Sequence, residues 1–133
     1  MSKLGAPEMG GFRPLASSYE SISEARDLVR SLLDAHTDQE RLSDVLLVTS
    51  ELVTNAIEHG GGTVAIKVDV SPESAAVTVR SDGDIVPAVP AGPVSPESLT
   101  GRGLLIADQL SDDFTAARTS DRHIHVTSHF RLP

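Results

Sequence analysis

The stretch Glu51-Leu52-Val53-Thr54-Asn55-Ala56-Ile57-Glu58-His59-Gly60 closes a segment with strong helical periodicity. In a helix, Glu51, Asn55 and His59 are spaced i, i+4 and i+8, so these three polar side chains project from one face. The same segment has enough apolar residues to build a core without them: Leu42, Val45, Leu46, Val53 and Ile57. A row made of an acid, an amide and an imidazole therefore needs a purpose other than packing.

The chemistry of this row suggests a site that handles a nucleotide. The carboxylate of Glu51 can accept a proton, and the amide oxygen of Asn55 can ligate a hard cation such as Mg²⁺. His59 has a simpler explanation, because an imidazole near a helix C-terminus is favoured by the helix dipole. Glu58 is expected to face solvent.

Composition excludes several classes of protein. The chain has 133 residues, of which 39% are hydrophobic and 23% charged, as in an ordinary globular domain. A net charge of −8 disfavours direct binding of nucleic acid, whose phosphates would be repelled. The absence of Cys excludes disulfides and thiolate metal sites. No apolar run has membrane-spanning length and the N-terminus lacks a signal-like apolar core, so we expect a cytoplasmic protein without membrane contact.

The remaining patterns predict an α+β fold: a two-layer sandwich whose mixed, mainly antiparallel sheet is covered by helices on one face. Residues 1–11 are expected to be a disordered tail and residues 12–133 a single domain. The expected elements are an edge strand within 12–18, helices at about 21–35 and 38–59, strands at 63–70 and 75–80, a helix at 104–110, and strands at 114–119 and 123–130. Residues 82–100 show no periodicity and are expected to form a lid.

Helix caps and turns support these boundaries. Ser21 or Ser23 can cap the first helix, and Thr37-Asp38 can cap the second. The run Gly60-Gly61-Gly62 is expected to end the second helix abruptly. The last hairpin is expected to turn at Ser120-Asp121.

Two further motifs could contribute to a site. In Ser81-Asp82-Gly83-Asp84, Gly83 permits a tight turn and Asp82 can accept a hydrogen bond from the exocyclic amine of a base. The alternative is a plain Asp-Gly turn. In Gly101-Arg102-Gly103, two glycines before a helix would leave backbone N–H groups free for phosphate at the positive end of the dipole. Ordinary helix capping is the alternative there.

The order of these motifs resembles that of the Bergerat-fold (GHKL) ATPases, the superfamily of gyrase and the histidine kinases. The sequence is most similar to the bacterial anti-sigma-factor serine/threonine kinases, over about residues 15–132. The resemblance depends on two segments, Ser50 to His59 and Thr100-Gly101-Arg102-Gly103-Leu104-Leu105-Ile106. It implies the histidine-kinase-like ATPase fold, with ATP and Mg²⁺ as cofactors.

The resemblance also assigns roles to individual residues. The asparagine that matches Asn55 ligates the Mg²⁺ that bridges the ATP phosphates, and the glutamate that matches Glu51 is the general base. The glycines that match Gly101 and Gly103 let the lid close on the phosphates, and Arg102 would help to neutralise phosphate charge. The other positions implied to bind the nucleotide are Ser81, Asp82, Gly83 and Leu104.

One motif departs from the family pattern. The family has Asp-x-Gly-x-Gly here, and its first Asp receives the adenine amino group. Alignment on Gly83 puts Ser81 at that Asp and Ile85 at the second glycine. Asp82 comes one residue late and would point to the opposite face of a strand, unless a bulge turned it inward. We therefore predict weakened ATP affinity, which sub-micromolar binding in calorimetry would refute.

The resemblance implies a regulatory protein that holds a sigma factor inactive and phosphorylates a serine of an anti-sigma antagonist. Family members are commonly dimers, so a homodimer is a further expectation. Two alternatives remain open at this point. The first is a pseudo-kinase that binds partners with weak or lost ATP binding, and the second is a stand-alone ATPase without a protein substrate.

A separate group of imidazoles invites a metal-site interpretation. His123, His125 and His129 fall on one face of the last strand by alternation with a period of two. Three imidazoles can hold a metal ion, but no carboxylate is locally paired with them to complete such a site. The alternative is an exposed sheet face with solvated histidines.

Overall fold

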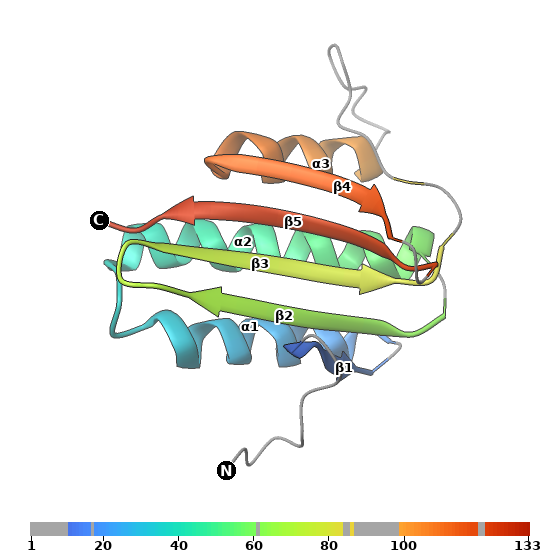
Figure 1. The fold of residues 1–133 in the computed structure, drawn as a ribbon, viewed down its shortest axis with the longest axis horizontal. Coiled ribbons are helices and arrows are strands. Elements are labelled where there is room, and N and C mark those ends of the chain that lie inside the picture. The colour runs from blue at the N-terminus through green and yellow to red at the C-terminus, as the bar shows by residue number, and fades with distance from the viewer. Residues whose placement is uncertain (1–10, 17, 61, 84–85, 87–98, 120–121) are drawn as a thin grey trace.

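The structure is a computed structural model that describes residues 11–16, 18–60, 62–83, 86, 99–119 and 122–133 (Figure 1). The expected tail at 1–10 lies outside the described residues. So do most of the expected lid, at 84–85 and 87–98, and the expected turn at Ser120-Asp121.

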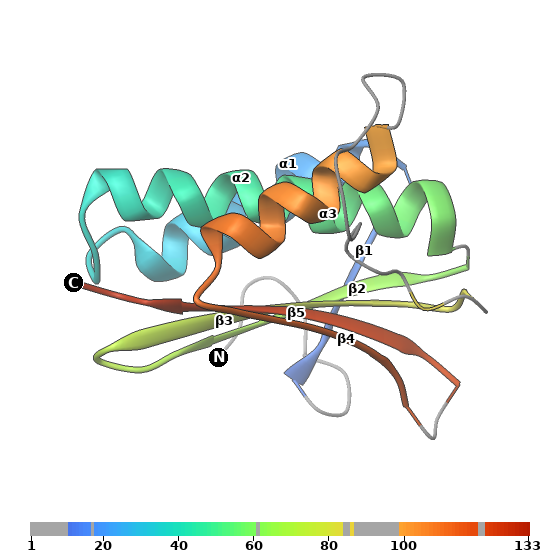
Figure 2. The same ribbon diagram turned by 90° about the horizontal axis from the view of Figure 1, so that it is seen from above.

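Five strands form one sheet in the order β1-β2-β3-β5-β4. The strands are β1 (Arg13–Leu15), β2 (Val64–Val70), β3 (Ser74–Ser81), β4 (Asp113–Arg118) and β5 (Ile124–Arg131). Every pairing among the described strands is antiparallel. The helices are α1 (Glu20–Leu33), α2 (Gln39–Asn55), its π-helical continuation η2 (Ala56–Gly60), and α3 (Leu99–Leu110). All of them lie on one face of the sheet (Figure 2), which confirms the predicted two-layer α+β fold.

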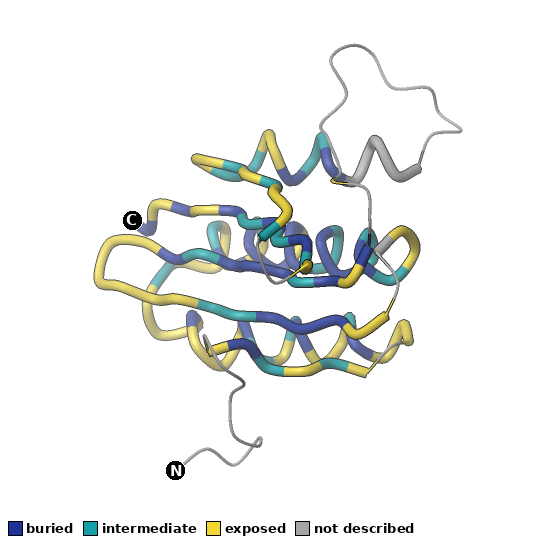
Figure 3. The backbone as a smooth tube through the Cα atoms, turned by 45° about the vertical axis from the view of Figure 1, so that its right-hand side comes forward, coloured by how far each residue is buried: buried dark blue, intermediate teal, exposed yellow. Residues whose placement is uncertain are grey.

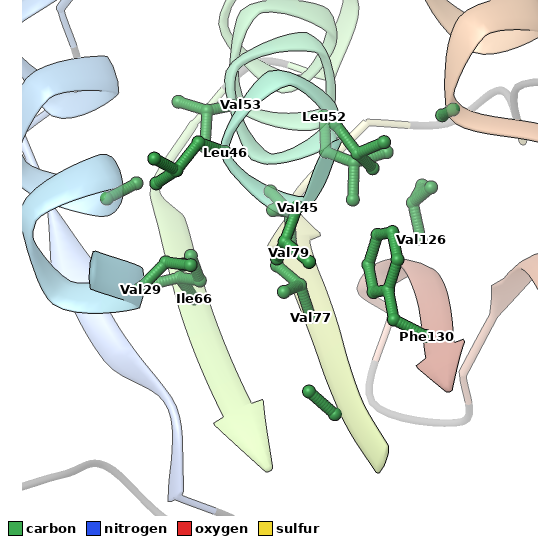
Figure 4. Close-up of a cluster of buried hydrophobic side chains, with 14 of the residues drawn as sticks. Val29, Val45, Leu46, Leu52, Val53, Ile66, Val77, Val79, Val126 and Phe130 are labelled. Carbon is green, nitrogen blue, oxygen red and sulfur yellow. The ribbon is translucent and has the colours of Figure 1, made fainter. Parts of the chain in front are cut away.

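The core lies between the helices and the inner face of the sheet, which is the face that the helices cover (Figure 4). Strand β5 shows the required alternation most clearly, because its side chains are buried at every second position: Ile124, Val126, Ser128 and Phe130. The buried residues of helix α2 extend from Leu42 to Val53, and α1 and α3 pack against this helix (Figure 3). Burial of these aliphatic faces supplies most of the driving force for folding.

Burial along β2 decreases from its first three residues, which include the buried Ala65, to its last two. Val64 and Ile66 are buried, whereas Val68 is half-buried and Val70 is exposed. The edge strand β1 has three residues and pairs only with Val64–Ile66. The second half of β2 therefore extends beyond its edge neighbour.

The sequence predicted the N-terminal cap of α2 correctly and the N-terminal cap of α1 wrongly. Helix α2 begins after Asp38, whose side chain accepts a hydrogen bond from the Arg41 N–H at 2.8 Å. Helix α1 begins at Glu20 without a side-chain cap. Ser21 lies inside α1 and its hydroxyl donates to the Ser18 carbonyl at 2.7 Å, so the predicted serine cap is wrong. Among the described residues, no helix has both the length and the apolar character needed to cross a membrane.

Arg41 joins three elements at the end of the molecule where α2 begins. Its guanidinium donates to the Leu110 carbonyl at the end of α3, at 3.0 Å, and to the Arg131 carbonyl on β5, at 3.0 Å. It also lies 5.1 Å from the centre of the Phe130 ring. Asp112 accepts from Arg41 at 2.6 Å and from the Arg131 N–H, so this carboxylate completes the junction.

Asp112→Ala should lower the free energy of unfolding by about 1 kcal/mol near neutral pH, a modest value because the carboxylate is half exposed. The Arg131 N–H, and then the charge of Arg41, lower the pKa of Asp112. A carboxyl pKa lowered by folding stabilises the protein above its unfolded value, and this contribution is lost as pH falls through the folded value. Urea unfolding should therefore show a smaller difference near about pH 3.

Asp108→Ala is the matched control, because Asp108 is an exposed carboxylate on α3. An equal loss of stability in both variants would contradict the role given to the Asp112 junction.

Candidate functional site

The candidate site lies where α2 changes into a π-helix. The α-helical part of α2 ends at Asn55, and η2 continues it through Gly60. The sequence predicted one continuous α-helix to His59, so the π-helical turn is a departure from that prediction. Short π-helical turns inside α-helices occur frequently at functional sites, because they change the direction of the side chains that follow.

Asn55 is the residue at this site that most needs a ligand. Its side-chain oxygen Oδ1 is buried and has no hydrogen-bond partner in the described part of the chain. A buried polar atom without a partner is costly, so its presence calls for an explanation such as a bound ion. An amide oxygen is a suitable ligand for Mg²⁺, and Asn55 therefore fits the metal-binding role that the sequence suggested.

Glu51 lies one helical turn before Asn55 and is half-buried. Burial raises the pKa of its carboxyl above the usual value, and the negative charge of Glu58 raises it further. A carboxylate with a raised pKa holds a proton more strongly, which suits a general base working near neutral pH. Glu51 is thus a half-buried carboxylate with a raised pKa, one helical turn from Asn55.

Glu58 and Tyr19 form a contact at this site that the sequence did not reveal. Glu58 is exposed, as expected, and its carboxylate accepts a hydrogen bond from the Tyr19 hydroxyl at 2.9 Å. This bond raises the pKa of Tyr19. His59 lies next to it, with Nε2 4.0 Å from the Glu58 carboxylate. Glu58 is therefore held near the candidate base by a residue from the start of α1.

Arg26 anchors the site from α1. Its guanidinium donates to the hydroxyl of Ser50 at 2.9 Å and to the carbonyl of Leu46 at 3.2 Å. Ser50 immediately precedes Glu51, so this contact fixes α2 at the turn that carries Glu51. Sequence pattern could not identify Arg26, because the contact spans 24 positions of the chain.

Strand β3 brings Ser81 to the helix side of the sheet. Val79 and Ser81 are both buried on the inner face, with exposed fractions of 2% and 5%, and Arg80 between them faces the outer side. Strand β3 also packs against η2, which follows Asn55 directly. The structure therefore brings Ser81 toward the end of α2, where Asn55 lies.

The side chain of Asp82 does not face the helix side of the sheet. One of its carboxylate oxygens accepts hydrogen bonds from the backbone N–H of Thr63, at 2.8 Å, and from the Thr63 hydroxyl, at 3.0 Å. The other lies 2.7 Å from Nδ1 of His123. These contacts, led by the Thr63 N–H, lower the pKa of Asp82. The carboxylate thus belongs to a cluster at the outer face, as strand alternation predicted, and not to the group around Asn55.

Gly62 packs closely against the Asp82 carboxylate of this cluster. It has a φ of +64°, and a Cβ atom there would lie 2.3 Å from Oδ2 of Asp82. Only glycine can occupy this position without moving the carboxylate. Gly83 follows Asp82 and is buried, whereas Asp84 and Ile85 of the same motif lie outside the described residues.

The glycine pair at the start of α3 requires a correction. The sequence predicted that Gly101 and Gly103 precede the helix, but α3 begins at Leu99 and contains both. Arg102 lies in the same first turns. Leu104 and Ala107 are buried, with exposed fractions of 3% and 0%, and α3 packs against α2. This packing outweighs the low helix propensity of glycine, which is why the predicted start is wrong.

The histidines of β5 do not form a metal site. Among the described residues, no group of three or more potential ligands lies close enough to hold a metal ion. His123 contacts Asp82, and the His125 ring lies 5.1 Å from the ring of Phe12. His129 is exposed. The metal interpretation is therefore not supported, and these side chains belong to the outer face of the sheet.

Comparison with known proteins identifies the family of the fold. No curated protein matches the chain at a significant level. A family model of the histidine kinase-like ATPase domain matches residues 15–128. This match includes α1, α2, η2, α3 and nearly all of the sheet, together with Glu51, Asn55 and Ser81. On that match, the chain belongs to the family of histidine kinase-like ATPase domains.

Proposed function

We propose that this protein is a regulatory ATP-binding protein of the anti-sigma serine kinase type. It would hold a sigma factor inactive and phosphorylate a serine of an anti-sigma antagonist. The observation that carries the proposal is the buried Oδ1 of Asn55, which has no partner among the residues that the structure describes and lies one turn beyond Glu51 in an ATPase-family domain. The segments Ser50 to His59 and Thr100 to Ile106 support the finer assignment to the anti-sigma kinases.

The proposed reaction divides the work among a few residues. Glu51 would take the proton of the serine hydroxyl while the serine oxygen forms its bond to the γ-phosphorus and ADP leaves. Asn55 would hold Mg²⁺ through Oδ1, and the bound ion would neutralise charge on the phosphate oxygens. Arg26 would keep the turn that carries Glu51 in place through Ser50. Catalysis would consist mainly of positioning and charge neutralisation.

A second candidate function is favoured by one observation. The carboxylate of Asp82 is turned away from the helix side, so the site offers the hydroxyl of Ser81 where a carboxylate would bind a base more strongly. This difference favours a pseudo-kinase that binds partners with weak or no ATP binding.

Labelled ATP, supplied with Mg²⁺ and a candidate antagonist, separates the candidates. A labelled antagonist supports the kinase, release of free phosphate alone indicates a stand-alone ATPase, and neither product indicates a partner-binding module.

Asn55→Ala should reduce the affinity for Mg-ATP by at least about tenfold, because it removes the proposed metal ligand. The variant should be as stable as the wild type or more stable, because no hydrogen bond is lost and alanine is a better helix former. Calorimetric titration and thermal unfolding measure the two effects. Gln109→Ala, which removes an exposed amide on α3, is the matched control. Wild-type affinity in Asn55→Ala would refute the metal-ligand assignment.

Glu51→Gln should reduce phosphotransfer by about 10²- to 10⁴-fold while leaving the binding of Mg-ATP nearly unchanged. Burial, and then Glu58, raise the pKa of Glu51 in the folded state. Such a group lowers the free energy of unfolding as pH rises from its unfolded to its folded pKa, because the folded protein holds the proton more tightly. The neutral glutamine removes this cost, so the free variant should melt at the same or a higher temperature at pH 7.

Glu40→Gln is the control for this substitution, because Glu40 is an exposed carboxylate at the other end of α2. It should leave phosphotransfer unchanged. Full activity in Glu51→Gln would show that another group is the base.

A further inference from the structure

We propose that Ser81 determines the base specificity of the nucleotide site and that the site accepts adenine and guanine nucleotides alike. The inference rests on the proposed nucleotide binding beside Asn55, and it adds the class of base to that function.

The first support is the position of the Ser81 hydroxyl. Ser81 is the last residue of β3, and its side chain faces the helices with an exposed fraction of 5%. Strand β3 packs against η2, the turn that follows Asn55. Its hydroxyl makes no hydrogen bond with the described residues, so it remains available to a ligand. A base bound at the end of β3 would contact the hydroxyl of Ser81.

The second support is that the neighbouring carboxylate is held elsewhere. Asp82 accepts two hydrogen bonds from Thr63, at 2.8 and 3.0 Å, and lies 2.7 Å from His123. Turning Asp82 toward the helices would break all three contacts, and hydrogen bonds to a charged group are stronger than those between neutral groups. The close fit of Gly62 against the carboxylate also shows that the chain is shaped around this outer position. Ser81 is therefore the polar side chain that β3 presents on the inner face at this end.

The third support is the chemistry of the two groups. An ionised carboxylate only accepts hydrogen bonds, so it would bind the exocyclic amine of adenine and repel the O6 oxygen of guanine. A serine hydroxyl carries one donor and two acceptor lone pairs, and it rotates to suit its partner. It can accept from the amine of adenine or donate to O6 of guanine. Replacing acid by hydroxyl thus weakens the interaction with adenine and removes the repulsion of guanine.

Calorimetric titrations of the wild-type protein with ATP, GTP and CTP, each with Mg²⁺, test the inference. The Kd values for ATP and GTP should agree within about tenfold, because the same hydroxyl can serve either purine. CTP should bind more weakly, because its smaller base is displaced from the hydroxyl.

Variants at two adjacent positions show which side chain sets the preference. Ser81→Ala should weaken the binding of ATP and of GTP by a similar factor. Ser81→Asp should restore a preference for ATP over GTP of at least about tenfold, because the carboxylate repels O6. Asp82→Asn is the matched control and should leave the ratio of the two Kd values unchanged. If Ser81→Asp does not fold, the wild-type ratio and Ser81→Ala decide the question.

Three outcomes would overturn the inference, and they differ in what they leave standing. ATP binding more than about a hundredfold tighter than GTP in the wild type would refute shared purine recognition while supporting the proposed function. Failure of all three nucleotides to bind would refute the proposed nucleotide site and this inference with it. A ratio that changes in Asp82→Asn would show that Asp82, and not Ser81, sets the preference between the two bases.

Discussion

Burial of α2 between two other helices and the sheet is the constraint on which the candidate site depends. Helix α2 packs against α1 and α3 and lies over β3 and β5. Val45, Val48 and Val53 are completely buried, so the helix has only one possible rotation about its axis. That rotation fixes the directions of Glu51 and Asn55. The packing that stabilises the domain therefore also positions the polar groups in advance of any ligand.

The candidate site residues lower the stability that this packing provides. The orphaned oxygen of Asn55 and the half-buried carboxylate of Glu51 both cost free energy in the unliganded fold. Neither side chain improves packing, and a chain selected only for stability would have little reason to place them here. Such local conflicts with the rules of folding are expected where a protein binds or reacts. They are the strongest physical argument that the end of α2 is functional.

Sequence periodicity was sufficient for the elements whose own residues form the buried faces. The extent of the sheet, the fold class and the Asp38 cap of α2 followed from patterns of two and 3.6 residues. The start of α3 did not, because Gly101 and Gly103 disfavour a helix locally and only contact with α2 supplies the compensation. The contacts of Tyr19 and Arg26 with the site join residues 39 and 24 positions apart. Local sequence carries no signal for such pairs.

The fit between Gly62 and Asp82 links two positions that are far apart in the sequence. Any side chain at position 62 would displace the carboxylate from Thr63, so the two residues cannot vary independently. A larger residue at position 62 would also remove the space that keeps Asp82 at the outer face. A substitution at Gly62 would therefore change where the Asp82 carboxylate lies without any change at position 82 itself.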